Sequence, residues 1–176
     1  YVTGSQATLL ASAARDMNLT GAVIRNDGDG NTVLVAARDM NLAAVQVATS
    51  QRSGDARNWS AQSVRTEVGT QIQAQGDVLL AAGQDLRVRA GNLTTEMGAL
   101  TLSAGRDVAL TAGQEQRITE SFSTSQSRKL FRKKTTTTYS KTEETTALAT
   151  TVSGARTTVL AGGDIQVQGS NLVSTE

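Results

Sequence analysis

Leu100-Thr101-Leu102-Ser103-Ala104-Gly105-Arg106-Asp107-Val108-Ala109-Leu110 is the stretch from which the fold is best predicted, because it holds two short alternating runs around a turn. Apolar residues take every second position in each run, and side chains of a β-strand alternate between its two faces. Between the runs, Gly tolerates a positive φ and Asp can bond its own backbone, so both favour a tight turn. The stretch therefore predicts strand, turn and strand.

The same pattern recurs along the chain at a nearly constant spacing. The hexapeptide Ala-Arg-Asp-Met-Asn-Leu at residues 14–19 returns unchanged at 37–42, which is 23 residues later. Residues 83–88 return in similar form at 105–110, 22 residues later, and again at 162–167. Short strands repeated at this spacing, without a helical stretch, are typical of a β-solenoid. We therefore predict an all-β fold, a parallel β-helix with coils of about 22 residues.

Equivalent residues of successive coils are expected to lie about 4.8 Å apart, the usual spacing of neighbouring strands. Leu19 should then pack near Leu42, and Leu86 near Val108, as apolar ladders inside the coils. The composition fits such a narrow core, since 38% of residues are hydrophobic but only 3% are aromatic. Aliphatic side chains must therefore fill most of the hydrophobic core.

Charged residues of the repeat should form columns on the outside of the coils. Arg15 would approach Arg38, with Asp16 beside Asp39, and neighbouring columns of opposite charge can offset each other. A ligand-binding charge stripe and a solvated turn both account for such columns.

The absence of several residue types narrows the chemistry. The chain contains no Cys, His or Pro, which excludes disulfides, thiolate metal sites and Ser–His or Cys–His nucleophile pairs. Its net charge is +1, and no run of about 18 apolar residues could form a membrane-spanning helix. Some β-helices cleave polysaccharides with clustered Asp residues, but the Asp residues here recur at equivalent turns. We expect no catalytic residue, no cofactor and no metal site, and a polysaccharide-cleaving β-helix remains a remote alternative.

Residues 26–31, Asn-Asp-Gly-Asp-Gly-Asn, resemble a calcium-binding loop. Counted from Asp27, however, the sixth position is Thr32 and the twelfth is Arg38, where a helical calcium loop has Gly and a bidentate Glu. The segment is better interpreted as a turn between strands.

The repeat is interrupted twice, at residues 46–69 and at residues 116–155. The coils resume after each interruption, so residues 1–176 are predicted to be one β-helix segment with two excursions. The sequence begins at Tyr1 and shows no signal peptide, and we expect it to be an excerpt from a longer chain.

The long interruption is predicted to be a β-hairpin that leaves the rod. Residues 117–125 and 135–142 alternate and are rich in Thr and Ser, which favours two strands. We expect the base of this hairpin to continue a sheet of the coils, with Glu143 and Glu144 near its basic residues.

The tip of this hairpin carries five cations and two large apolar residues. These candidate surface-binding residues are Arg128, Lys129, Leu130, Phe131, Arg132, Lys133 and Lys134. Such a tip can bind a membrane surface, lipopolysaccharide or nucleic acid, but a charged tip that keeps an exposed hairpin soluble and discourages edge-to-edge pairing is the favoured interpretation. Nucleic acid is not expected as a partner, because interleaved stacking aromatics are few.

Residues 100–113 resemble the haemagglutinin repeat of filamentous haemagglutinins and contact-dependent growth inhibition exoproteins. The basic, Thr-rich tract at residues 128–138, followed by Gly162-Gly163-Asp164-Ile165, is similar to a longer variety of that repeat. The resemblance covers essentially the whole chain.

This resemblance implies a right-handed parallel β-helix within a very long secreted protein of a Gram-negative bacterium. It implies two-partner secretion, in which a partner outer-membrane transporter exports the chain through a domain not visible here. The expected function is that of a shaft segment of a surface adhesin or toxin-delivery protein. The alternative is a module that uses the basic hairpin at 117–146 to bind a target-cell outer membrane, lipopolysaccharide or a receptor.

Overall fold

The computed structural model describes residues 6–175, and within this range the chain forms β-strands and no helix. The predicted all-β class with parallel sheets is confirmed. The described chain divides into two compact units. Residues 6–45, 67–113 and 147–175 form the first, named here the coil unit, and residues 46–66 and 114–146 form the second.

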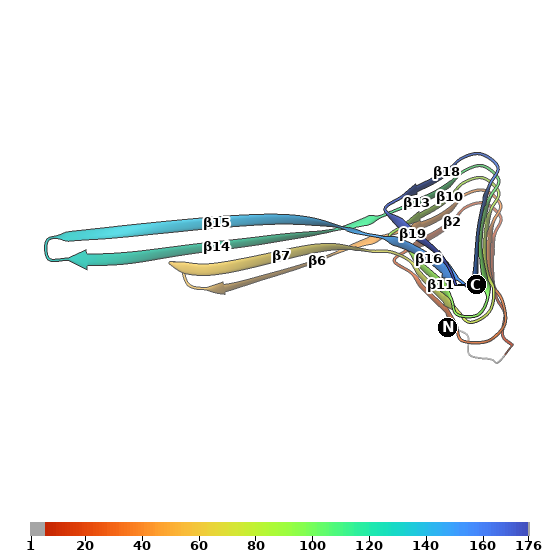
Figure 1. The fold of residues 1–176 in the computed structure, drawn as a ribbon, viewed down its shortest axis with the longest axis horizontal. Coiled ribbons are helices and arrows are strands. Elements are labelled where there is room, and N and C mark those ends of the chain that lie inside the picture. Colours follow the sequence, from red (N-terminus) through yellow and green to blue (C-terminus); the bar gives the residue numbers. More distant parts are fainter. Residues whose placement is uncertain (1–5, 176) are drawn as a thin grey trace. The chain divides into compact units, whose positions relative to one another are not determined.

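Three parallel sheets of five strands make up the coil unit, and the chain visits them in turn, as in a β-helix (Figure 1). The first sheet contains β1 (Leu9–Ala13), β4 (Thr32–Ala36), β9 (Val78–Ala82), β12 (Ala99–Ala104) and β17 (Arg156–Ala161). The second contains β2 (Met17–Thr20), β5 (Met40–Ala43), β10 (Leu86–Arg89), β13 (Val108–Thr111) and β18 (Ile165–Gln168). The third contains β3 (Val23–Asn26), β8 (Gln71–Ala74), β11 (Asn92–Thr95), β16 (Thr150–Gly154) and β19 (Ser170–Ser174).

The strand register stacks the repeated residues on one another. Leu19 pairs with Leu42 and Leu86 pairs with Val108, so both predicted ladders are confirmed. Inward residues of the middle coils are almost fully buried, and nearly all of them are aliphatic. The largest of these side chains are Leu34, Met40, Leu42, Ile72, Leu80, Leu86, Leu93, Leu100, Leu102 and Leu110.

The repeated glycines between the first and second sheets are required for a different reason from the one predicted. None of Gly83, Gly105 and Gly162 has a positive φ. A Cβ on Gly105 would instead lie 2.2 Å from the backbone oxygen of Gly83, and one on Gly162 would lie 2.2 Å from that of Gly105. Stacked backbones therefore approach too closely for a side chain at this corner.

The repeated aspartates also act between coils, where the sequence predicted a bond to their own turn. The Oδ1 atom of Asp39 accepts a hydrogen bond from the backbone N–H of Asp85 at 3.1 Å. Asp107 Oδ1 accepts one from the backbone N–H of Asp164 at 2.9 Å. Each carboxylate thus joins its own coil to the coil that stacks on it. This contact could not be predicted from the sequence of a single turn.

The Asn-Asp-Gly-Asp-Gly-Asn segment is a turn held by Asn26. The buried Asn26 side chain donates from Nδ2 to the Gly30 oxygen at 3.1 Å, and its Oδ1 accepts from the Gly28 N–H at 3.1 Å. Asp27 pairs with Arg25 at 2.6 Å. The asparagine therefore closes the loop with its own amide group.

The coils occupy part of what the sequence assigned to the excursions. Strand β16 pairs with β11 on one side and β19 on the other, and its Val152 is fully buried. Residues 67–69 likewise belong to the coil unit. Strands in the coils and in the excursions both alternate with period two, so the boundary leaves little mark in a Thr-rich sequence.

The second unit is one sheet of four strands in the order β15-β14-β7-β6. These strands are β6 (Val45–Gly54), β7 (Asn58–Val68), β14 (Gly113–Lys129) and β15 (Arg132–Leu148). The expected continuation of a coil sheet into the hairpin is not observed, because the long hairpin pairs with the short one instead. Both insertions follow a strand of the second coil sheet and precede a strand of the third.

Candidate binding surface on the four-stranded sheet

The four-stranded sheet is held together by a long antiparallel pairing between the two excursions. Strands β7 and β14 pair from Asn58 opposite Ser123 to Thr66 opposite Glu115. Strands β14 and β15 are neighbours joined only by Leu130 and Phe131. Ser, Thr and Gln are frequent in all four strands, so this sheet relies on its backbone ladder more than on burial.

An aromatic row crosses one face of this sheet. Trp59 on β7 lies opposite Phe122 on β14, with ring centroids 6.0 Å apart and planes inclined by 14°. Tyr139 on β15 lies 6.5 Å from Trp59, and the guanidinium of Arg52 on β6 sits 4.1 Å from the centre of a Trp59 ring. The row therefore links all four strands through cross-strand contacts, which are the unit of stabilisation in a sheet.

The phenol of Tyr139 ends the row with a hydrogen bond. Its hydroxyl donates to Glu120 Oε1 at 2.7 Å. This bond, together with partial desolvation and the charge of Glu120, raises the pKa of Tyr139 above its ordinary value. The phenol is therefore held protonated as a donor.

Nearer the base of the sheet, polar side chains bond across and along the strands. Thr66 donates to Glu115 Oε2 at 3.1 Å, and Arg117 pairs with Glu115 at 3.3 Å. Glu143 accepts from the Gln116 side chain and lies 3.9 Å from Lys141. Glu143, expected to face basic residues across or near the base of the hairpin, thus lies near Lys141 and binds Gln116 there.

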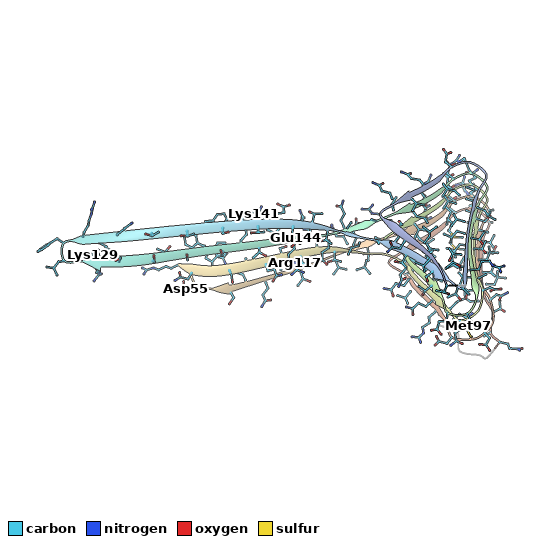
Figure 2. The ribbon with its side chains drawn as sticks, viewed as in Figure 1. Asp55, Met97, Arg117, Lys129, Lys141 and Glu144 are labelled. Carbon is cyan, nitrogen blue, oxygen red and sulfur yellow. The ribbon has the colours of Figure 1, made fainter. Side chains whose placement is uncertain are left out.

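The predicted surface-binding residues all lie together at the tip of the long hairpin. Arg128 and Lys129 end β14, while Arg132, Lys133 and Lys134 begin β15. Leu130 and Phe131 form the turn and are 93% and 97% exposed. Figure 2 shows Lys129 beside this turn, with Lys141 and Glu144 farther along β15. Within residues 6–175, no ion pair joins any of the five tip cations to an acid.

The turn carboxylates of the coils are already engaged. Asp85 is 2% exposed and binds the guanidinium groups of Arg106 and Arg87. These contacts, the hydrogen bond from Arg106 above all, lower the pKa of Asp85 to about 2. Arg38 binds Asp16 of the preceding coil in the same way, at 2.7 and 3.0 Å. In both cases an Arg of one coil pairs with an Asp of the preceding coil, so the Arg and Asp columns neutralise each other.

The sequence did not predict the aromatic row, although it contained a signal for it. Every aromatic residue except Tyr1 lies in the two excursions. Trp59, Phe122 and Tyr139 sit far apart in the chain, and only the pairing of two separate excursions brings them together.

Clusters of acidic side chains and long apolar helices are the features that would indicate a metal site or a membrane-spanning helix in the described part of the chain. Across residues 6–175, no three acidic side chains gather closely enough to hold a metal ion. In the same range, no helix has the length and apolar character to cross a bilayer.

Comparison with protein-family models identifies a family that covers most of the chain. A family model described as Hemagglutinin repeat matches residues 53–176, which include the long hairpin and the coils on either side of it. No curated protein matches the chain, and no solved structure matches it.

Proposed function

The chain belongs to the hemagglutinin repeat family, and from this premise we propose that it is a shaft segment of a large secreted filamentous protein. The family is a structural and adhesin family, and its members are typically secreted or displayed at the cell surface. In this proposal the coils build the filament, and the four-stranded sheet is displayed from it. The parent protein is an adhesin or a contact-dependent inhibition exoprotein.

The observation that carries this proposal is the unbroken stacking of the coils. Apolar ladders and Asp–backbone bonds run through the described coils in register. The ladder continues into β18, where Ile165 stacks on Val108 but is still 49% exposed. An apolar, hydrogen-bonding coil face of this kind suits the addition of further coils.

The same proposal includes the finer details of the rod. Coils of about 22 residues are supported by the pairing of Leu86 with Val108 and of Leu9 with Thr32. A right-handed winding is favoured because connections between parallel strands of one sheet are almost always right-handed. Export through a partner outer-membrane transporter follows from the proposed filament class, since coils can fold one after another without disulfides.

A pair of variants in the producing bacterium tests the shaft role. Leu80→Asp with Leu102→Asp places two carboxylates in the core, which should abolish surface display and adhesion together. Serine at all five tip cations should leave display and adhesion at the wild-type level. Adhesion that survives in the core variant would refute the shaft role. If the tip variant is displayed normally but no longer adheres, the tip and not the shaft is the functional part.

A second candidate function is supported by the tip of the long hairpin. Two nearly fully exposed apolar side chains are surrounded by five cations that no acid neutralises in the described chain. This combination favours an anionic, amphiphilic surface such as lipopolysaccharide or an acidic membrane. We propose membrane binding by this tip as the alternative function.

Vesicle sedimentation tests the alternative. The 176-residue chain should bind vesicles with anionic headgroups at low salt, and serine at all five tip cations should reduce binding at least about tenfold. A matched control replaces five exposed cations elsewhere with serine, namely Arg15, Arg57, Arg65, Lys141 and Arg156. Equal losses in both variants would indicate nonspecific charge attraction and would count against the tip.

A further inference from the structure

Strand β15 is a long edge strand, and no strand within residues 6–175 pairs with its outer side. It comes last in the order of its sheet, so its only described neighbour is β14. All of its 17 residues except Leu148 are exposed, and Thr residues with high β propensity fill its middle. A long edge of this kind presents a row of unpaired backbone donors and acceptors, which is a template for another strand.

The charges on this edge are separated by sign along the strand, except that Lys141 lies two residues before Glu143. Arg132, Lys133 and Lys134 stand at its start, and Glu143 and Glu144 stand near its end. A second β15 in parallel register would place Lys opposite Lys and Glu opposite Glu, which is destabilising. An antiparallel β15 would place the basic start of each strand against the acidic end of the other.

We propose that two copies of this chain pair through their β15 edges, antiparallel, about a two-fold axis at Thr138. In this register Arg132 lies opposite Glu144, because both are six residues from Thr138. Lys133 lies opposite Glu143, because both are five residues away. The axis generates each pair twice, which gives four cross-strand ion pairs. Thr142 lies opposite Lys134 and Thr135 opposite Lys141, so no like charges face each other.

The faces of the sheet agree with this register. Tyr139 bonds to Glu120 and Glu143 accepts from Gln116, so these two residues of β15 share a face. Alternation along the strand places Lys133 on that same face, and Arg132 and Glu144 together on the other. A two-fold axis perpendicular to a sheet keeps each face on its own side. Both proposed charge pairs therefore join residues of one face.

A second copy explains this pattern better than an unrelated acidic strand. A two-fold contact uses the same surface on both partners, so a strand that is basic at one end and acidic at the other complements itself. A purely acidic partner would meet repulsion at Glu143 and Glu144. The contact also closes, since each copy uses its single β15 edge, and it joins two four-stranded sheets into one of eight strands.

Charge reversal with rescue tests the pairing in solution. Sedimentation velocity of the 176-residue chain should show a dimer whose proportion rises with concentration. Glu143→Lys with Glu144→Lys should raise the dimer dissociation constant by roughly 100-fold or more, and Arg132→Glu with Lys133→Glu should do the same, since four attractive pairs become repulsive. Combining all four substitutions should restore the dimer, because the opposed charges are again complementary.

The matched control reverses two cations that lie near the edge but outside the pairing. Arg128→Glu with Lys129→Glu changes the net charge by the same amount as the Arg132 and Lys133 variant, yet lies on β14. It should leave dimer formation within about twofold of wild type, while weakening vesicle binding if the tip acts on membranes. This variant therefore distinguishes failure of the dimer from failure of the proposed membrane function, because only vesicle binding should change.

Cysteine cross-linking tests the register itself. The chain contains no Cys, so Thr138→Cys introduces a single thiol at the proposed axis. Opposed Cα atoms in an antiparallel pair lie about 4.5–5.5 Å apart, a separation that a disulfide can span. Oxidation should link most of this variant to itself, whereas Ser123→Cys, exposed on the interior strand β14, should link little. The proposal would be overturned if the chain stays monomeric at all concentrations or if charge reversal leaves the dimer unchanged. Equal cross-linking of the two cysteine variants would also overturn it.

Discussion

The coils and the four-stranded sheet use the same alternating strands but are stabilised by different interactions. In the middle coils one face of each strand is buried in an aliphatic interior, and Leu34, Leu80 and Leu102 are fully buried there. In the four-stranded sheet no residue of β15 is fully buried, and the shared face of β7 and β14 is only half-buried. Burial makes the coil a repeating scaffold, whereas an open sheet leaves both faces and its edges available for contacts.

The difference extends to how side chains are used. Polar groups in the coils join one coil to the next, as the carboxylates of Asp39 and Asp107 do. Polar and aromatic groups in the sheet join strands from distant parts of the chain, as Trp59 and Phe122 do. We therefore expect substitutions in the coils to reduce global stability and substitutions in the sheet to act locally.

The largest effect is expected from truncation inside the coils. Leu102→Ala should lower the free energy of unfolding by about 3 kcal/mol, because it removes buried methyl groups and leaves a cavity. The matched substitution in the sheet, Ile118→Ala, should cost only about 1 kcal/mol, since Ile118 is half-buried. Denaturant unfolding followed by circular dichroism measures both. Equal losses would show that the open sheet is packed as tightly as the coils.

A smaller loss is expected from a Cβ at the close-packed corner of the coils. Gly105→Ala should destabilise the chain by about 2 kcal/mol, because the new Cβ would press on the backbone oxygen of Gly83. Gln84→Ala is the control, since it shortens an exposed side chain at the same corner and adds no Cβ. Thermal unfolding should rank the control close to wild type. If the two variants unfold together, backbone contact is not the reason for the glycine.

The ion pairs between coils should make the free energy of unfolding depend on pH in the acidic range. The pKa of Asp85 is lowered to about 2, below its ordinary value of 3.8, so folding favours the ionised form. The resulting stability is present above about pH 4 and is lost as the pH falls toward 2. Asp85→Asn should therefore unfold more readily at pH 7 and lose less stability than wild type between pH 5 and pH 2. Parallel pH profiles for the two proteins would contradict this role.

The most local effect is expected from the aromatic row. Phe122→Ala should weaken the four-stranded sheet by about 1 kcal/mol, because Trp59 loses its stacking partner. Hydrogen exchange should accelerate at residues 58–66 and 115–123 while the coils keep their protection. Ser121→Ala, on the opposite face of β14, should change neither region. Loss of protection in the coils as well would mean that the two units unfold as one.

The repeat in the sequence carried most of the information about the coils. The spacing of 22 or 23 residues predicted which side chains stack, and Leu19 does pair with Leu42. The basic tip was also visible, since its seven residues are contiguous and need no partner to be recognised. Local alternation did not locate the end of the long excursion, because β16 alternates just as the hairpin does.

Features that repeat or are contiguous could therefore be predicted without the structure: the all-β class, the parallel ladders and the exposed tip. The groups that meet across coils and excursions become visible in the folded chain alone. The tertiary structure gave the turn glycines and aspartates their role between coils, and it paired β7 with β14 so that Trp59 and Phe122 stack. The physical reason is that these contacts join residues tens of positions apart, and their energy depends on register, which no local pattern specifies.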